Sequence, residues 1–278
     1  MAKLFLLGCL VYQLGIAPVS AKPAEGIQTL ESHALLLKDD SAILQVGEEL
    51  TYNISYLIDI GQVRVKITDK VQKDHHTYYN AIVYIDSYKG IPFGGIHYIF
   101  ETMMDPGFFS AWFHSVDRDD RSGGYTQYDF DYSKKIVFIE HGYKDTTRQK
   151  FRQSIAIDTF CQDGLSLFYY ARSLVNTKQQ ITTPSVVGDK KVSTYFNFLN
   201  ERSGETIDAV DYPVDVIHFD GKANFVGIYG LTGEFEGWFS NDPVRIPIRA
   251  KMNVIIGSIK IELMKWNRPG WNPPRFSD

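Results

Sequence analysis

Residues 125–139 read YTQYDFDYSKKIVFI, and their alternating pattern indicates the fold class. Aromatic and polar residues alternate as far as Tyr132, and a period of two is typical of a half-buried β-strand. The polar residues 133–135 are suited to a turn, and residues 136–139 lead back as a second apolar run. The stretch therefore predicts a β-hairpin.

Similar alternation recurs on both sides of this hairpin. The segments are rich in Val, Ile, Tyr and Phe, which favour the pleated, half-buried surface of a sheet. Most are separated by short polar turns, as in a β-meander. The further predicted strands are residues 50–56, 61–68, 78–84, 96–103, 192–198, 214–219, 233–240, 244–252 and 254–263.

One segment in mid-chain has helical periodicity instead. Leu167, Tyr170, Ala171 and Leu174 stand at positions i, i+3, i+4 and i+7, which is the spacing of one helix face. Asp163 is suited to cap the start of this helix. The sequence therefore predicts a mainly β protein, a strongly curved antiparallel sheet or open β-barrel with one principal short helix packed on the concave face.

The first 21 residues have the organisation of a secretory leader. Lys3 is followed by the apolar residues 4–16 and by residues 19–21 (VSA), a small-x-small cleavage pattern. The apolar run is too short to span a bilayer comfortably. We therefore expect a signal peptide over residues 1–21 and an exported mature chain, periplasmic or secreted. Cys9 leaves a lipoprotein as the alternative.

The mature chain divides into three parts. Residues 22–45 have a mixed composition and are expected to form an N-terminal arm. Residues 46–265 carry the predicted strands and form a single β-rich domain. Residues 266–278 contain three prolines, so we expect an extended C-terminal tail.

The composition excludes several classes of protein. Hydrophobic residues make up 44% of the chain and aromatic residues 14%, which excludes a disordered chain. The net charge of −4 lacks the basic excess that binds nucleic acid. One of the two cysteines lies in the leader, so we expect Cys161 to be a small buried hydrophobe. No later segment is apolar enough to cross a membrane.

Motifs for metal, nucleotide or catalytic chemistry are missing or incomplete. The pair His75-His76 is expected in a solvated turn between two strands. Residues 117–123 (DRDDRSG) superficially resemble a calcium loop, but Arg121 occupies a ligand position. The glycines within residues 227–233 lack the dinucleotide-binding pattern. We therefore expect no metal, no cofactor and no enzymatic activity, with a hydrolase as a remote alternative.

Aromatic side chains are the candidate ligand contacts. Alternation places Tyr128, Phe130 and Tyr132 on one strand face and Tyr125 on the other, while Tyr169 lies in the predicted helix. We expect Tyr128, Phe130, Tyr132 and Tyr169 to line a ligand cavity, or else to form part of the core.

A second apolar cluster lies within residues 103–113, around an Asp-Pro-Gly turn. Methionine and phenylalanine on a loop are suited to a flexible lip over a cavity. Core packing is the alternative interpretation of the same residues.

Four segments, taken in order, resemble a known family. They are residues 47–52 (GEELTY), 163–172 (DGLSLFYYAR), 237–247 (GWFSNDPVRIP) and 257–263 (GSIKIEL). Together they resemble family 3108 of the domains of unknown function, a family of exported bacterial proteins, over about residues 45–265. The resemblance implies a curved antiparallel sheet around a helix, similar to the LolA/LolB-like lipoprotein-carrier half-barrel. It implies no activity and no catalytic residues.

These features lead to two hypotheses about function. The first is a cell-envelope protein that binds or carries an amphipathic ligand, a lipid or a glycan, in the hollow of a curved sheet. The second is a structural or assembly factor that offers a sheet edge or surface to another envelope protein.

Overall fold

The computed structural model describes residues 42–91, 95–118, 123–144, 150–226, 232–253 and 257–277. The expected signal peptide, Cys9 and most of the expected N-terminal arm lie outside these residues. Most of the calcium-like loop and of the glycine-rich stretch lies outside them too.

Within these described residues, fourteen strands form one antiparallel sheet. Two meanders, β1–β8 and β9–β14, are joined where β1 pairs with β14, and β8 and β9 are the two edges of the sheet. The sheet therefore curls without closing into a barrel. The strands are β1 (Glu49–Ser55), β2 (Asp59–Lys73), β3 (His76–Ser87), β4 (His97–Met104), β5 (Ser110–Asp117), β6 (Gly124–Asp131), β7 (Ile136–Tyr143), β8 (Phe151–Ala156), β9 (Gln180–Val187), β10 (Lys190–Glu205), β11 (Val214–Val226), β12 (Thr232–Ser240), β13 (Pro247–Asn253) and β14 (Ser258–Asn267).

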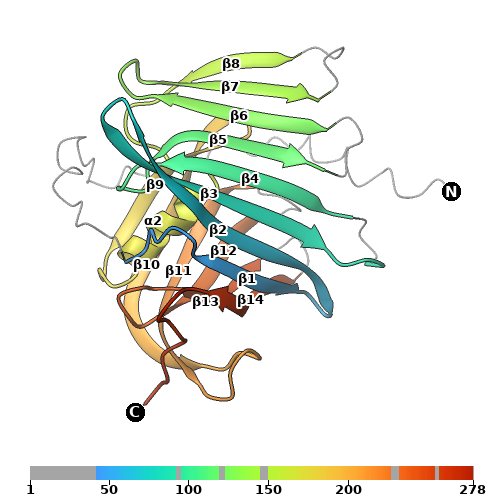
Figure 1. Cartoon of the computed structure of the whole chain (residues 1–278), viewed down its shortest axis with the longest axis vertical. Coiled ribbons are helices and arrows are strands. Elements are labelled where there is room, and N and C mark those ends of the chain that lie inside the picture. The colour runs from blue at the N-terminus through green and yellow to red at the C-terminus, as the bar shows by residue number, and fades with distance from the viewer. Residues whose placement is uncertain are drawn as a thin grey trace.

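The sheet folds back on itself around a helix. In Figure 1, β1–β8 run across the front, β9–β13 lie behind them, and helix α2 (Ser166–Leu174) lies between the two layers. Ala171 of α2 packs with Phe198 and Phe219 of the rear strands, and Tyr169 packs into the core shared with β1 and β2. The predicted fold class is confirmed.

Asp163 fixes the start of α2. One oxygen of its carboxylate accepts hydrogen bonds from the backbone N–H groups of Leu165 and Ser166, at 2.6 and 2.9 Å. These groups lack partners within the helix itself, so the predicted capping role is confirmed. The second oxygen accepts hydrogen bonds from the hydroxyls of Ser110 (2.7 Å) and Thr102. Asp163 therefore joins α2 to β4 and β5.

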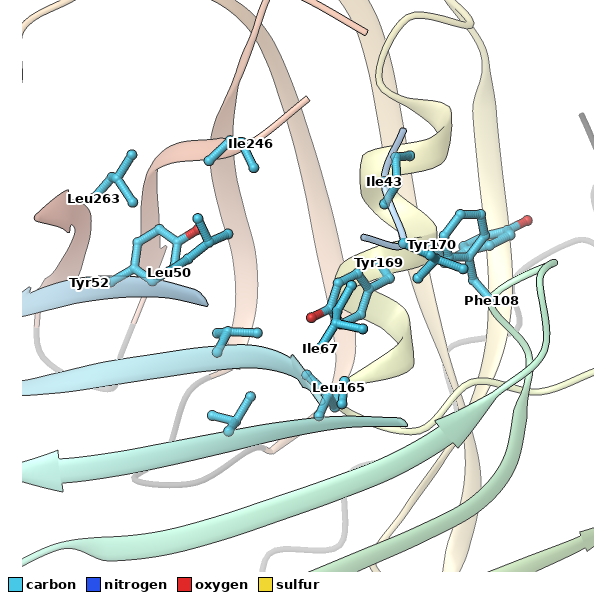
Figure 2. Packing of buried hydrophobic residues seen from close by; sticks show 14 of the residues in the cluster. Ile43, Leu50, Tyr52, Ile67, Phe108, Leu165, Tyr169, Tyr170, Ile246 and Leu263 are labelled. Carbon is cyan, nitrogen blue, oxygen red and sulfur yellow. The ribbon is translucent and has the colours of Figure 1, made fainter. Parts of the chain in front are cut away.

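The main core lies between α2 and the sheet. Figure 2 shows Leu50 and Tyr52 of β1 below Ile246 and Leu263, and Ile67 of β2 next to Tyr169 and Leu165. All seven are at most 5% exposed. Burying one such side chain contributes about 1.5–3 kcal/mol, so this cluster is the principal source of stability around the helix.

The predicted lip within residues 103–113 is wrong, and core packing is the correct interpretation. Met104, Phe108 and Phe109 are 0%, 4% and 6% exposed. Phe108 adopts a φ of 68°, which turns the chain inward, and the Asp105 carboxylate accepts the Phe109 N–H at 2.9 Å. Phe109 then stacks on Phe160 with the ring centroids 4.8 Å apart.

The two ends of the curled sheet differ. One end, which we call the closed end, carries α2, the β4–β5 and β12–β13 connections and residues 268–277. The other end, which we call the rim, carries the β1–β2, β3–β4, β5–β6 and β7–β8 connections. The closed end is on the left in Figure 1 and the rim on the right.

A buried cluster of charges holds the closed end together. Glu48, just before β1, is 1% exposed, and Arg172 of α2 is 0% exposed. The Arg172 guanidinium donates two hydrogen bonds to the Glu48 carboxylate, at 2.7 and 3.1 Å, and two more to the backbone carbonyls of Val244 and Arg245. Arg268, after β14, also donates to Glu48. One carboxylate therefore links three distant segments of the chain.

The expected tail packs against the closed end. Trp271 is 8% exposed and donates its indole N–H to the Asp242 carboxylate at 2.8 Å. Further along, Arg275 pairs with Val214 at the start of β11. At the other terminus, Ile43 and Leu44 are also buried in the main core. Residues at both ends of the described chain thus complete the core.

Replacing Glu48 with glutamine should destabilise the protein strongly. The substitution removes the charge between two buried guanidinium groups, and breaking a buried ion pair in this way costs about 3–5 kcal/mol. The midpoint of urea denaturation measures the loss. Glu49→Gln is the matched control, because Glu49 and its partner Lys66 are 32% and 43% exposed and such pairs contribute about 0–1 kcal/mol. Equal midpoints for the two variants would contradict a stabilising role for the buried charges.

Asp105 should make the stability depend on pH. Burial raises the pKa of its carboxyl from the ordinary 3.8 to about 6. The folded protein therefore holds this proton more tightly than the unfolded chain, and the stability falls as the pH rises through about 6. Asp105→Asn should gain about 2–2.5 kcal/mol relative to the natural protein between pH 4 and pH 8, because at pH 4 this carboxyl is already partly ionised in the unfolded chain. Denaturation at both pH values tests this, and a constant difference between the two proteins would refute it.

Candidate ligand-binding face

Burial of the inward-facing side chains decreases from the closed end to the rim. On β2, Ile67 and Val65 are 0% and 4% exposed, whereas Val63 is only half-buried. On β3 the same change occurs between Val83, which is 5% exposed, and the half-buried Ile85. Helix α2 covers the buried part, so the concave face near the rim carries apolar side chains that retain contact with solvent.

We call these half-buried, inward-facing residues the inner rim face. Pairing in the sheet makes them neighbours, since Val63 lies opposite Ile85 and Ile85 lies opposite Tyr98. Phe100 stacks on Tyr98 with the ring centroids 5.8 Å apart. The inner rim face consists of Ile54, Val63, Ile85, Tyr98, Phe100 and Ile261. It offers one continuous apolar surface to a ligand.

Polar groups border the inner rim face. The Tyr98 hydroxyl donates to the Asp117 carboxylate at 3.0 Å, at the rim ends of β4 and β5. A hollow of about 340 Å³ at the same end lies on the outer side of these strands, because its lining residues Asp86 and His97 alternate with the inward-facing Ile85 and Tyr98. The arrangement is apolar within and polar at its border, which suits an amphipathic molecule.

The predicted aromatic strip lies deeper in the molecule. Tyr128 is 3% exposed and stacks on Phe113 with the ring centroids 5.1 Å apart, and burial raises the pKa of the Tyr128 hydroxyl. Phe130 and Tyr132 are partly buried against the same cluster, and the Tyr132 hydroxyl donates to the Ser110 carbonyl at 2.7 Å. The structure thus brings Tyr128, Phe130 and Tyr132 together.

Tyr169 lies apart from the strip. It is fully buried on α2, and its hydroxyl has no hydrogen-bond partner within the described part of the chain, as is also true of Tyr52. Tyr125 is on the opposite face of β6, where its hydroxyl donates to Glu140. The role of Tyr128, Phe130, Tyr132 and Tyr169 as ligand contacts stays a prediction.

Sequence reasoning did not single out the inner rim face. Its residues belong to predicted strands and have the ordinary alternation of a core face. The pattern shows which side of a strand is apolar, but it does not show how far along the strand the helix covers that side. The sequence therefore indicated that these side chains face inward, but it did not indicate that they stay uncovered by the helix.

A buried polar cluster lies at the start of α2. The Ser110 hydroxyl is 2.7 Å from the hydroxyl of Ser166 and 2.7 Å from the Asp163 carboxylate, and all three residues are fully buried. Burial raises the pKa of Asp163 in spite of these hydrogen bonds. Because Asp163 also caps the helix, the cluster has a structural role at the closed end.

The remaining candidate residues lie as follows. Asp74 and the exposed His75 form the β2–β3 turn with positive φ angles, so the solvated-turn interpretation is confirmed. Cys161 is 0% exposed, and its expected burial is confirmed. Among the described residues, no group of three or more His, Cys, Asp or Glu side chains is arranged to hold a metal ion.

A groove of about 540 Å³ lies over the rear strands, with Tyr195 and Phe235 as well as charged residues in its lining. Asp220 and Lys222 of β11, Glu234 and Glu236 of β12 and Lys251 of β13 line it. Glu236 and Lys251 form an ion pair at 3.6 Å. Charges of both signs alternate along this surface, which is typical of the solvated face of a sheet.

Comparison with known proteins bears on the family and the fold. No curated protein sequence matches the chain. Among solved structures, a beta-barrel-like protein of the domain of unknown function DUF1849 from Brucella abortus is similar, with a TM-score of 0.56 and 9% identity, over 81% of this chain and 98% of that chain. At this identity the likeness shows the fold alone. The family model described as protein of unknown function (DUF3108) matches residues 49–264 and confirms the resemblance found in the sequence, so the chain belongs to the DUF3108 family.

Proposed function

We propose that the protein is an exported cell-envelope protein that binds and carries an amphipathic lipid on the inner rim face. The observation that carries the proposal is the fall in burial along β2, β3 and β4, which leaves aliphatic and aromatic side chains half-exposed on a concave surface. Ligand sites are concave and mostly apolar, with a few polar groups that fix orientation. Tyr98 and Asp117 supply such groups at the border.

A lipid fits this surface better than a glycan does. Val63, Ile85, Phe100 and Ile261 offer no hydrogen bonds to sugar hydroxyls, whereas acyl chains gain about 25 cal/mol for each Å² of apolar area removed from water. The polar border then lies where the headgroup of a lipid would meet solvent. In this proposal the acyl chains of the lipid lie on the inner rim face, and its headgroup lies at the polar border.

The leader supports the proposed export to the cell envelope. Its charged start, apolar run and small-x-small pattern are those of a signal that is removed on export. In the described part of the structure, no helix has the length and apolar character needed to cross a membrane. A periplasmic or secreted carrier is consistent with such a leader.

The edge of the sheet favours a second candidate, an assembly factor. Among the strands of the described chain, β8 pairs with β7 alone, and its Phe151 is 55% exposed. An edge strand with free backbone groups can accept a strand from another protein. In this role the purified protein would retain a protein partner and no lipid.

Lipid retention tests the carrier. The full chain is produced with its own leader in a bacterial host, and an organic extract of the purified protein is analysed by mass spectrometry. We expect about one lipid per chain. An extract without lipid, together with a stably bound protein, would exclude the carrier and favour the assembly factor. Ile85→Gln, on the inner rim face, should lower the lipid content about tenfold, because it removes apolar contact worth about 1.5 kcal/mol.

Ile82→Gln is the matched control for this substitution. Ile82 lies on the same strand with similar burial, but it faces outward, opposite Lys66 and Glu101. The Ile82→Gln variant should retain as much lipid as the natural protein. Circular dichroism should show the same β-sheet content in the Ile82→Gln and Ile85→Gln variants. An equal loss in the two variants would place the lipid elsewhere.

The mature terminus tests export. We expect cleavage after Ala21, so the intact mass of protein from the periplasmic or secreted fraction should match residues 22–278. A mass that retains Cys9 with attached acyl chains would identify a lipoprotein instead. Recovery of the uncleaved chain from the cytoplasm would contradict export.

A further inference from the structure

Two aliphatic side chains project from the tip of the β1–β2 hairpin. Leu57 is 87% exposed and Ile58 is 60% exposed, and these are the highest values for any large hydrophobic residue in the described part of the chain. Scattered apolar residues on a surface need no explanation. Two adjacent aliphatic residues at the apex of a projecting hairpin expose far more apolar area than the fold requires.

The tip is held in a defined conformation. The Tyr56 N–H donates to the Ile58 carbonyl at 3.0 Å, and the Asn53 side chain donates to the Asp59 carboxylate at 2.6 Å. Tyr88, from the end of β3, donates its hydroxyl to Asn53 at 3.2 Å. These contacts come from three strand ends. The fold therefore presents Leu57 and Ile58 outward and does not let them fold back onto the sheet.

The tip stands beside the inner rim face. Ile54 of β1 and Val63 of β2 are members of that face, and the hairpin that joins their two strands ends at Leu57 and Ile58. Figure 1 shows this hairpin projecting at the rim, away from α2 and the closed end. Whatever contacts the tip therefore lies next to the opening of the proposed lipid site.

We propose that the β1–β2 tip docks on the surface of a lipid bilayer, with Leu57 and Ile58 inserted among the lipids. This inference rests on the proposed function, because docking would place the inner rim face where a lipid can leave or enter the membrane. The β1–β2 tip is a second site, distinct from the inner rim face. In the proposed role the tip contacts the bilayer surface, whereas the inner rim face holds a single lipid.

The chemistry of the tip favours a bilayer over a protein partner. A stable protein interface buries about 800 Å² on each partner and uses about 20–30 residues, and two side chains on a convex tip do not supply that. A bilayer needs no complementary surface. Tyr56 and Tyr88 flank the tip, and tyrosine is enriched at membrane–water interfaces, where its ring and its hydroxyl meet apolar and polar surroundings.

Flotation with vesicles tests the docking site. Vesicles of phosphatidylethanolamine and phosphatidylglycerol, without other additions, are mixed with the full mature protein and floated through a density gradient. The natural protein should float, and the double variant Leu57→Asp, Ile58→Asp should bind at least about tenfold less, because each aliphatic residue buried contributes a factor of about ten or more. Raising the salt from 0.05 to 0.5 M should change little, because insertion is apolar.

Val46→Asp is the matched control. Val46 is also an exposed aliphatic residue, at 46%, but it precedes β1 at the closed end. The Val46→Asp variant should float with the vesicles as the natural protein does. The docking site is overturned if the natural protein stays unbound, if the double variant floats equally, or if the double variant and Val46→Asp lose binding to the same extent. Loss of a co-purifying protein with unchanged flotation would also overturn it, in favour of a protein partner.

The lipid extract separates this inference from the proposed function. The double variant should retain lipid like the natural protein, since the tip is outside the inner rim face. Lipid in the extract without flotation of the natural protein would refute only the docking site. Flotation that depends on the tip, with no lipid in the extract, would uphold the docking site and refute the carrier.

Discussion

The Glu48 carboxylate, buried between Arg172 and Arg268, is the constraint on which the closed end depends. Its partners come from the helix and from the chain after the last strand, and Arg172 also bonds the carbonyls of the turn before β13. Charges removed from water are stable only when each has its partners. The sheet, the helix and both chain ends must therefore assemble together, which couples segments that are 124 and 220 residues apart.

The anchored helix determines where the concave face is covered. Helix α2 has nine residues and is about 14 Å long, whereas the 15 residues of β2 extend for about 50 Å. A helix fixed at the closed end by Arg172 and Asp163 cannot reach the rim. The fall in burial from Ile67 to Val63 follows directly from this difference in length. The closed end supplies stability, and the rim keeps apolar side chains in contact with solvent.

Local patterns predicted much of the fold, because alternation and helical spacing are visible within ten residues. Strands β5, β8 and β9 were missed. In β9 the pattern is interrupted by Pro184, which an edge strand tolerates. The Glu48–Arg172 pair has no local signal at all. The aromatic strip was conspicuous in the sequence, yet Tyr128 is packed on Phe113. The inner rim face was hidden, because its coverage depends on where a distant helix stops.

An apolar face of this kind sets limits on specificity. Hydrophobic burial is non-directional and scales with area, so Val63, Ile85 and Phe100 would accept acyl chains of different length or branching. Discrimination must come from groups with fixed geometry, and on this surface those are at the border, where Tyr98 is already bonded to Asp117. A headgroup that cannot match such polar groups leaves them desolvated and unpaired, which costs about 1–3 kcal/mol for each group. In the proposed role, selection would therefore act on the headgroup at the rim and hardly on the chains within.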